Sequence, residues 1–419
     1  MKTISENKIQ GIELLKISIK NTFAKPLNSI KSFEELAIET KVSTQTLRRF
    51  FGKIDTEKKI SKTSLSLLCK YVGFNDWETF LENLENEKSI SEVDKNFIEN
   101  MAVFFKNGEK YNINYHQNTL TADTLNDYAK VIYKNKENLE YFYQLYKENN
   151  WATDYILAWI PNYNFYGQNW YRKILQDKSI RTNVSHVKLS QTNFLFFGSF
   201  LTNENVEFTP DIELLNSYYE QYKKTFLYMP YHEMRYCTMQ LIEAKKEGNQ
   251  EKFHKKLYQY LHNLEAQNFD EFNYQELIIV LCNTLIWLQE YETAYSLLKN
   301  VKSYIKNYPK LKKSKNAFHY YGMNMVFVKT TFALVYLANK DTNLEDFEIT
   351  NTEFNDFTDL LYHDYIRVMY FAKCILEKKS LKQKQLIFNN LKVFVNKSSY
   401  AKIYDVLKNL DPLFSEYFF

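Results

Sequence analysis

The chain has 419 residues, of which 45% are hydrophobic and 25% are charged, and this balance excludes a wholly disordered protein. It contains only 8 glycines and 6 prolines, which disfavours sheet-rich folds and folds that bind nucleotides through glycine-rich turns. The net charge is +4, but residues 1–75 hold 14 Lys and Arg against 7 Asp and Glu, so they carry +7 and the remainder carries −3. A basic first module is typical of proteins that bind nucleic acid.

The cysteines give no sign of a metal or redox site. They are far apart and form no CxxC pair: Cys69, Cys237, Cys282 and Cys374. The first 20 residues lack the continuous apolar core of a signal peptide, and no stretch reaches the roughly 20 apolar residues that a membrane helix needs. We therefore expect a cytoplasmic protein that uses no metal and no cofactor and contacts no membrane.

The first two predicted elements are helices. An apolar stripe at helical spacing predicts the first one, and it consists of Ile12, Leu15, Ile19 and Phe23. The second is expected from Ser32 to Thr40, because Ser32 is a good N-cap and Glu35 would complete a capping box. Both belong to a small module that we expect to span residues 1–90.

A third helix follows after a tight turn. Ser43 is its expected N-cap, Leu47 and Phe50 share its inner face, and Gly52 should end it. Ala37, a small residue, stands where the second and third helices would cross. Two short helices joined in this way form a helix-turn-helix unit.

Two more helices complete the expected five. The first runs over residues 61–73, from a serine cap to a glycine. The second begins after either Asn75 or Asp76, both of which are good N-caps.

These residues resemble the XRE-type, or phage-repressor-type, helix-turn-helix domain. The resemblance lies in the run SFEELAIETKVSTQTLRRFFGK and in the later run SKTSLSLLCKYVGFNDWETFL. It implies that the third helix enters the major groove of double-stranded DNA and that the protein binds paired half-sites as a homodimer. Lys41 stands in the turn where the family usually has glycine.

The resemblance also assigns the DNA-binding residues. Thr44, Gln45 and Thr46 would reach base edges, and Arg48 or Arg49 would reach bases or phosphates. Lysines on either side would contact phosphates and set the register. The full set is Ser43, Thr44, Gln45, Thr46, Arg48, Arg49, Lys31, Lys41 and Lys53.

Residues 91–230 are expected to form a helical middle region. Helices are predicted at 97–105, 128–146 and 213–226, while the polar residues 108–121 suggest a loop or a short hairpin. Residues 141–171 are dense in aromatic side chains, and Trp151, Tyr155 and Trp159 are spaced to share one helical face. Either a buried seam between helices or a stacking groove would explain them, and the seam is favoured.

Residues 231–419 show a loose repeat. Apolar hairpins start near residues 232, 274, 317 and 359, a spacing of about 42 residues, and each is expected to contain an apolar helix, a polar turn and a second helix. Residues 281–301 resemble the tetratricopeptide repeat, with Leu281, Leu285, Ala294 and Leu298 at its apolar or small positions. Such arrays commonly present a surface for a peptide or protein ligand.

Catalytic motifs are not apparent. There is no GxGxxG, Walker A, HExxH or GxSxG sequence, and His254 and His262 are too far apart to act as adjacent metal ligands on a helix. A nuclease-like pattern of Asp211, Glu243 and Lys245 is weak, because the last two would diverge on a helix. We expect a protein that is not an enzyme.

The sequence thus predicts an all-α protein with a five-helix helix-turn-helix domain and an α-solenoid of helical hairpins. The expected function is a DNA-binding transcriptional regulator whose repeats sense a ligand or form a dimer. The alternative is an interaction scaffold or adaptor, of a stress or phage-defence type, whose first module does not bind DNA.

Overall fold

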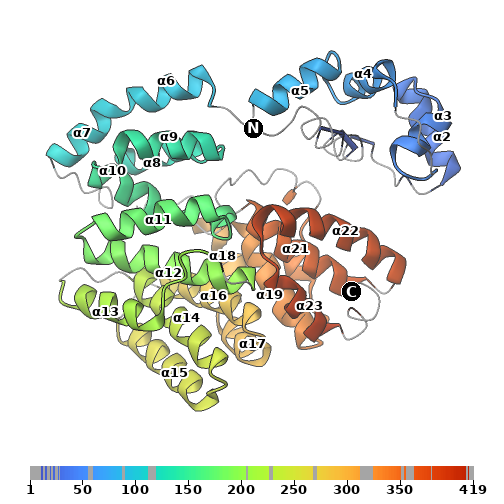
Figure 1. Cartoon of the computed structure of the whole chain (residues 1–419). Coiled ribbons are helices and arrows are strands. Elements are labelled where there is room, and N and C mark those ends of the chain that lie inside the picture. The colour runs from blue at the N-terminus through green and yellow to red at the C-terminus, as the bar shows by residue number, and fades with distance from the viewer. Residues whose placement is uncertain are drawn as a thin grey trace. The chain divides into compact units, whose positions relative to one another are not determined.

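The computed structural model of the chain confirms the all-α class for the residues that it describes, since all of their regular structure is helical (Figure 1). Within these residues, every helix is too short or too polar to cross a lipid bilayer. The described residues are 11–12, 15–16, 19, 22–23, 27, 29–54, 60–86, 90–111, 119–203, 206–225, 230–267, 271–311, 324–350, 353–354, 363–378, 380–411 and 414.

The chain divides into two compact units, Met1–Asn96 (unit 1) and Phe97–Phe419 (unit 2). The expected middle region, residues 91–230, lies in unit 2 from Phe97 onward, together with the expected repeat region 231–419.

Unit 1 is built from short helices around one apolar core. Its described helices are α2 (Ile30–Thr40), α3 (Thr44–Phe50), α4 (Lys62–Tyr71) and α5 (Trp77–Asn86), followed by α6 (Glu92–Asn100) across the boundary. Helix α2 packs against both α3 and α4, and α4 packs against α5. Three residues of the predicted first stripe, Leu15, Ile19 and Phe23, are buried in this core.

The start of α2 differs from the prediction. Ser29 is the N-cap, and its hydroxyl oxygen accepts a hydrogen bond from the Ser32 N–H at 3.1 Å. Ser32 is buried inside the first turn, where its side chain completes the capping box in place of Glu35. Two serines three residues apart offer the same capping pattern in either register, and the structure uses the earlier one.

The remaining caps of unit 1 follow the predicted residues. Of the two candidates for α5, Asp76 is the one that caps it, accepting a hydrogen bond from the Thr79 N–H at 2.8 Å. This bond holds the pKa of the Asp76 carboxyl below its usual value. At the end of α4, Gly73 has a φ of 96°, a left-handed conformation that suits glycine.

Unit 2 continues with helices throughout its described length. Its elements are α7 (Ala102–Lys110), α8 (Thr119–Ile132), α9 (Lys136–Tyr146), α10 (Asn150–Asp154), η1 (Tyr155–Trp159), η2 (Tyr163–Phe165), α11 (Asn169–Arg181), α12 (Ser185–Thr202), α13 (Ile212–Lys223), α14 (Pro230–Lys246), α15 (Gln250–Ala266), α16 (Glu271–Trp287), α17 (Tyr291–Asn300), α18 (Ser303–Leu311), α19 (Met325–Ala338), η3 (Glu345–Phe347), α21 (His363–Glu377), α22 (Leu381–Ser398) and α23 (Lys402–Leu410).

The first part of unit 2 is more broken than predicted. The expected helix over 128–146 is two helices, because Asn135 caps α9 with its side-chain oxygen and interrupts the chain of backbone bonds. The segment 108–121 is helical at both ends, in α7 and α8, and residues 112–118 lie outside the described part. Residues Tyr155–Trp159 form a π-helix, so Trp151 and Trp159 do not share one regular α-helix.

Three turns of the later hairpins share one backbone conformation. Gly248, Gln289 and Lys340 have φ values of 66°, 62° and 58°. In each turn this residue donates its N–H to the carbonyl three residues earlier, and the next residue donates to the carbonyl five residues earlier, all at 2.9–3.1 Å. This is the Schellman helix end, and it occurs between α14 and α15, between α16 and α17, and after α19.

The hairpins themselves agree with the predicted pattern in part. Helices α14 and α15, α16 and α17, and α21 and α22 form packed pairs. After α19, however, the described chain has only the short 3₁₀ turn η3 before residue 350. The predicted hairpin starts at 317 and 359 lie outside the described residues.

Helix α23 packs against helices that come much earlier in unit 2. Helices α12, α14, α16, α19 and α21 each pack against the next, and α23 packs against α12, α16 and α21. Ile403, Val406 and Leu407 of α23 are fully buried in these contacts. At the end of α12, Asn203 donates a hydrogen bond to Asp405 of α23 at 3.2 Å. Helix α23 therefore covers part of the surface formed by α12, α16 and α21.

Candidate nucleic-acid interface

The start of α3 is held by the predicted cap. The Ser43 hydroxyl oxygen accepts a hydrogen bond from the Thr46 N–H at 3.2 Å, and the two side-chain hydroxyls lie 2.8 Å apart. These contacts fix the first turn of the helix, which is the turn that would face base edges. Because the Ser43 and Thr46 hydroxyls bind each other, Thr44 and Gln45 are left as the more available polar side chains.

The end of α3 is held by Gly52, as the sequence predicts. At a φ of 68°, Gly52 donates its N–H to the Arg49 carbonyl at 2.9 Å, and Lys53 donates to the Arg48 carbonyl at 2.7 Å. The pair of bonds is a Schellman motif. It places the Lys53 side chain, which is exposed, directly after the helix that carries the two arginines.

The turn between α2 and α3 is strained at one residue. Lys41 has a φ of 58°, in the left-handed region, and its side chain is exposed. A residue with a side chain costs about 1 kcal/mol there relative to glycine. Beneath it, Thr40 donates its hydroxyl to the Leu36 carbonyl at 2.7 Å and Val42 is buried. The turn therefore adopts the conformation that suits glycine although it carries a lysine.

The two helices meet over buried apolar side chains. Leu36 of α2 and Leu47 of α3 are both 0% exposed, and Phe50 is almost fully buried. Ala37 is half-buried against the same core, in agreement with its expected position at the contact between helices. Burying large side chains on one face directs the opposite face of α3 toward solvent.

All nine residues of the predicted interface lie outside the buried core. Five of them are exposed and four are half-buried. The exposed residues are Lys31, Lys41, Ser43, Gln45 and Lys53. The half-buried residues are Thr44, Thr46, Arg48 and Arg49.

The cations of this set are not neutralised within the described part of the chain. Their side chains form neither ion pairs nor hydrogen bonds with any residue described there, whereas Lys62 of α4 binds Glu78 at 2.7 Å. The positive charge lies on α3 and its flanks, because α2 also carries glutamates. One of these, Glu39, accepts a hydrogen bond from the Tyr71 hydroxyl at 2.7 Å, and burial together with this bond raises the pKa of Tyr71 to about 12.

The weak nuclease pattern does not come together as a site. Asp211 caps α13 by accepting a hydrogen bond from the Leu214 N–H, and Lys245 pairs with Glu290 of the next hairpin. His262 stacks on Tyr258 of its own helix. Among the described residues, no group of three or more His, Cys, Asp and Glu side chains could hold a metal ion.

The aromatic segment 141–171 is mainly a buried seam, the favoured interpretation. Most of its rings are buried, and the buried ones are Phe142, Tyr143, Tyr146, Trp151, Tyr155, Tyr166 and Tyr171. Several contact aromatic rings of other helices edge to face, such as Tyr146 with Phe105 of α7 at 4.9 Å between ring centres. These rings hold helices together.

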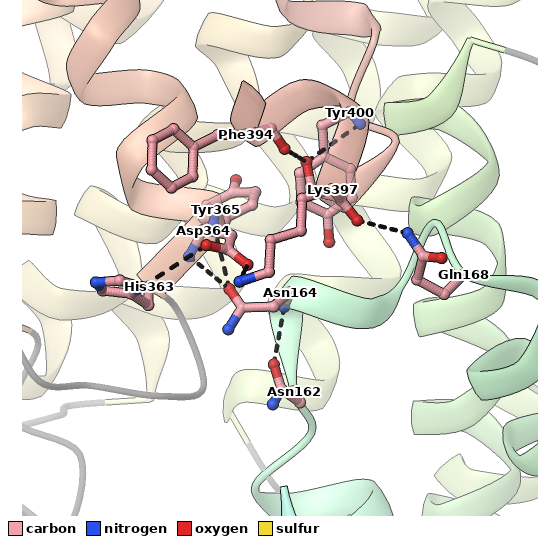
Figure 2. Close-up of polar contacts among 10 residues, drawn as sticks. Asn162, Asn164, Gln168, His363, Asp364, Tyr365, Phe394, Lys397 and Tyr400 are labelled. Atoms are coloured by element: carbon pink, nitrogen blue, oxygen red, sulfur yellow. Dashed lines mark hydrogen bonds and ion pairs between the residues drawn. The ribbon is translucent and has the colours of Figure 1, made fainter. Parts of the chain in front are cut away.

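A polar cluster in unit 2, which sequence patterns do not reveal, joins distant segments (Figure 2). The Asn164 side-chain oxygen accepts a hydrogen bond from the Asp364 N–H at 2.8 Å and so caps α21 from 200 residues away. The Lys397 ammonium lies 2.8 Å from the Asp364 carboxylate. Gln168 donates to the Lys397 carbonyl at 2.7 Å. Each partner is an ordinary isolated polar residue in the sequence, so no motif predicts the cluster.

The charge of this cluster is set by its contacts. Burial by itself would raise the pKa of Asp364, but the neighbouring His363 ring, 3.7 Å away, and the positive charge of Lys397 bring it below the usual value. The carboxylate thus remains ionised and binds the lysine. We infer that the cluster holds η2 against the hairpin of α21 and α22.

Comparison with family models finds no match for this chain, and comparisons with curated proteins and with solved structures find none either.

Proposed function

We propose that the chain is a DNA-binding transcriptional regulator in which α3 of unit 1 contacts double-stranded DNA. The observation that carries the proposal is the set of unneutralised cations on a helix whose two ends are fixed by caps. A rigid helix with free Arg and Lys side chains can contact phosphates without first breaking internal ion pairs. Gln45, exposed in its first turn, has the amide needed to pair with adenine.

Unit 2 would supply ligand sensing or dimerisation. Its support is the series of packed helix pairs with one repeated turn conformation, which favours a tetratricopeptide-like solenoid. Because α23 covers part of the face between α12, α16 and α21, a peptide or protein ligand would need another part of the surface. As a homodimer, the protein would place two α3 helices on paired half-sites. The proposal assigns no catalytic step to the chain.

Two substitutions separate base reading from phosphate contact. After selection of bound genomic fragments, Gln45→Ala should reduce the preference for the selected site over scrambled DNA by about 1–3 kcal/mol. Lys41→Ala should weaken binding to both DNAs equally and lower the slope of log K against log salt by about 0.9. Lys70→Ala, on α4, is a control that should leave both quantities unchanged. Equal binding by wild type and the Arg48→Ala/Arg49→Ala variant would exclude α3 as the contact.

One observation favours the alternative of a docking module. Ile30 and Ile38 on α2 are 57% and 80% exposed, which is unusual for isoleucine and suits a protein contact. In that case Ile38→Lys would release a stoichiometric protein partner, and the chain would show no salt-dependent affinity for DNA. A reduced preference for the selected site in Gln45→Ala, together with an unchanged preference in Ile38→Lys, would decide for the regulator.

A further inference from the structure

A second basic surface lies on α22 in unit 2, far along the chain from α3. The helix carries Lys382, Lys384, Lys392 and Lys397 and contains no acidic residue. It packs against α21 and lies at the edge of the unit in Figure 1. Its apolar face is turned inward, since Phe388, Leu391 and Val395 are buried.

The outward side of α22 carries a polar stripe. Its members recur at intervals of three and four residues and all are exposed: Lys382, Gln385, Asn389, Lys392 and Asn396. At 100° per residue they fall within an arc of about 80°. We call these five residues the α22 stripe. Lysines and side-chain amides are the groups that contact phosphate and sugar oxygens of DNA.

Only part of the charge on α22 is available to a ligand. Lys384 pairs with Asp411, and Lys397 pairs with Asp364 in the cluster of Figure 2. Lys382 forms no ion pair with any described residue. Lys392 is an exposed residue whose ammonium lies 4.4 Å from the centre of the Phe388 ring. These two free lysines are about 15 Å apart along the helix, at 1.5 Å per residue. That spacing is comparable with the roughly 12 Å width of the major groove, so they can reach phosphates on its two sides.

We propose that the α22 stripe is a second surface for the phosphate backbone of duplex DNA, independent of α3. A membrane surface fits less well, because a helix that inserts into lipid needs a continuous apolar face with aromatic residues. Here the only exposed apolar side chains within the helix are Leu381, Leu386 and Val393, which are 42%, 52% and 42% exposed. The inference goes beyond the proposed function, since the α22 stripe can bind DNA whether or not α3 reads a sequence.

The test is the binding of the full chain to a labelled 30-base-pair duplex of random sequence, measured by fluorescence anisotropy at 50 and 200 mM salt. Lys382→Glu/Lys392→Glu should weaken binding at least about tenfold at low salt and lower the salt slope by about 1.8, or 0.9 for each lost contact. Lys382→Gln/Lys392→Gln, which removes charge without reversing it, should lower the slope equally. Circular dichroism verifies that each variant is folded.

Lys255→Glu/Lys299→Glu is the matched control. Both lysines are exposed, and Lys299 lies over the Tyr295 ring at 4.7 Å as Lys392 lies over Phe388. Binding that is unchanged in the α22 variants, or weakened equally in the control, overturns the inference. Release from phosphatidylserine vesicles but not from DNA also overturns it.

The same assay separates this inference from the proposed function. Arg48→Ala/Arg49→Ala isolates the contribution of α3. If that variant loses binding while the α22 variants keep it, the proposed function stands and the second surface is excluded. If the arginine variant binds as wild type and the α22 variants do not, the second surface stands and α3 is excluded.

Discussion

Replacing Gly198 with alanine should destabilise unit 2 by about 3 kcal/mol. Gly198 lies in α12 directly against the Arg172 side chain and the Tyr166 carbonyl. A Cβ atom there would be 2.6 Å from Arg172 Nη1 and 3.0 Å from the Tyr166 carbonyl carbon, and it would overlap the carbonyl oxygen. The Tyr166 carbonyl belongs to the backbone and cannot move away as the end of a flexible side chain can. The surrounding core would therefore have to shift.

The Arg172 side chain cannot easily move away from the added Cβ atom either. It is fully buried, and its guanidinium donates to four backbone carbonyls and one hydroxyl at 2.7–3.1 Å. Burial lowers the pKa of Arg172 to about 10, yet the side chain remains charged at neutral pH. Overpacking costs about 1–3 kcal/mol, and each lost hydrogen bond to a charged group costs about 1.5–3 kcal/mol. The better helix propensity of alanine offsets about 1 kcal/mol.

The assay is urea unfolding followed by tryptophan fluorescence, which reports mainly on unit 2 because four of the five tryptophans lie there. Gly248→Ala is the control, since a Cβ at Gly248 would meet open space and only its φ of 66° is unfavourable. That change should cost about 1 kcal/mol. A Gly198→Ala protein within about 0.5 kcal/mol of wild type would refute the packing argument.

Three further predictions concern a buried histidine, a strained turn residue and a buried ion pair. Burial lowers the pKa of His186 to about 4 from 6.5, so unit 2 should be fully stable above pH 6.5 and lose roughly 1–3 kcal/mol as the pH falls toward 4; His186→Phe should flatten this decline in a pH series of melts. Lys41→Gly should relieve the left-handed turn and stabilise unit 1 by about 1 kcal/mol in thermal unfolding, while weakening any DNA contact; an unchanged or lowered stability would contradict the strain. Lys178→Met should cost about 3–5 kcal/mol in urea, because it strands the buried Asp154 carboxylate 2.8 Å away, and adding Asp154→Leu should recover most of the loss. Failure of the double variant to recover would show that the pair acts through packing alone.

Local features of the fold could be predicted because neighbouring residues decide them. The cap at Ser43 and the helix end at Gly52 depend on residues within five positions, and both are confirmed. The start of α2 is not decided locally, because Ser29 and Ser32 are both good N-caps and the structure uses Ser29. Likewise, no local signal distinguishes the π-helix at Tyr155–Trp159 from an α-helix.

Long-range contacts could not be predicted. The Asn164 cap on α21 and the packing of α23 against α12 join segments some 200 residues apart. A buried Arg172 also contradicts the usual placement of arginine at surfaces. The four backbone carbonyls that accept hydrogen bonds from Arg172 belong to separate segments, and only folding brings them together. The candidate DNA-contact residues remain a prediction, and the structure shows only that they are exposed or half-buried on one short helix and its flanks.

The most direct test of the account is the salt dependence of DNA affinity for the intact chain and for a variant with alanine at both arginines of α3. The account predicts that the wild-type affinity falls steeply between 50 and 200 mM salt and that the variant has a lower affinity and a slope smaller by about 1–2. A wild-type affinity that is immeasurably weak at 50 mM salt, or a variant with the same affinity and slope, would contradict the assignment of α3 as the DNA-contacting helix.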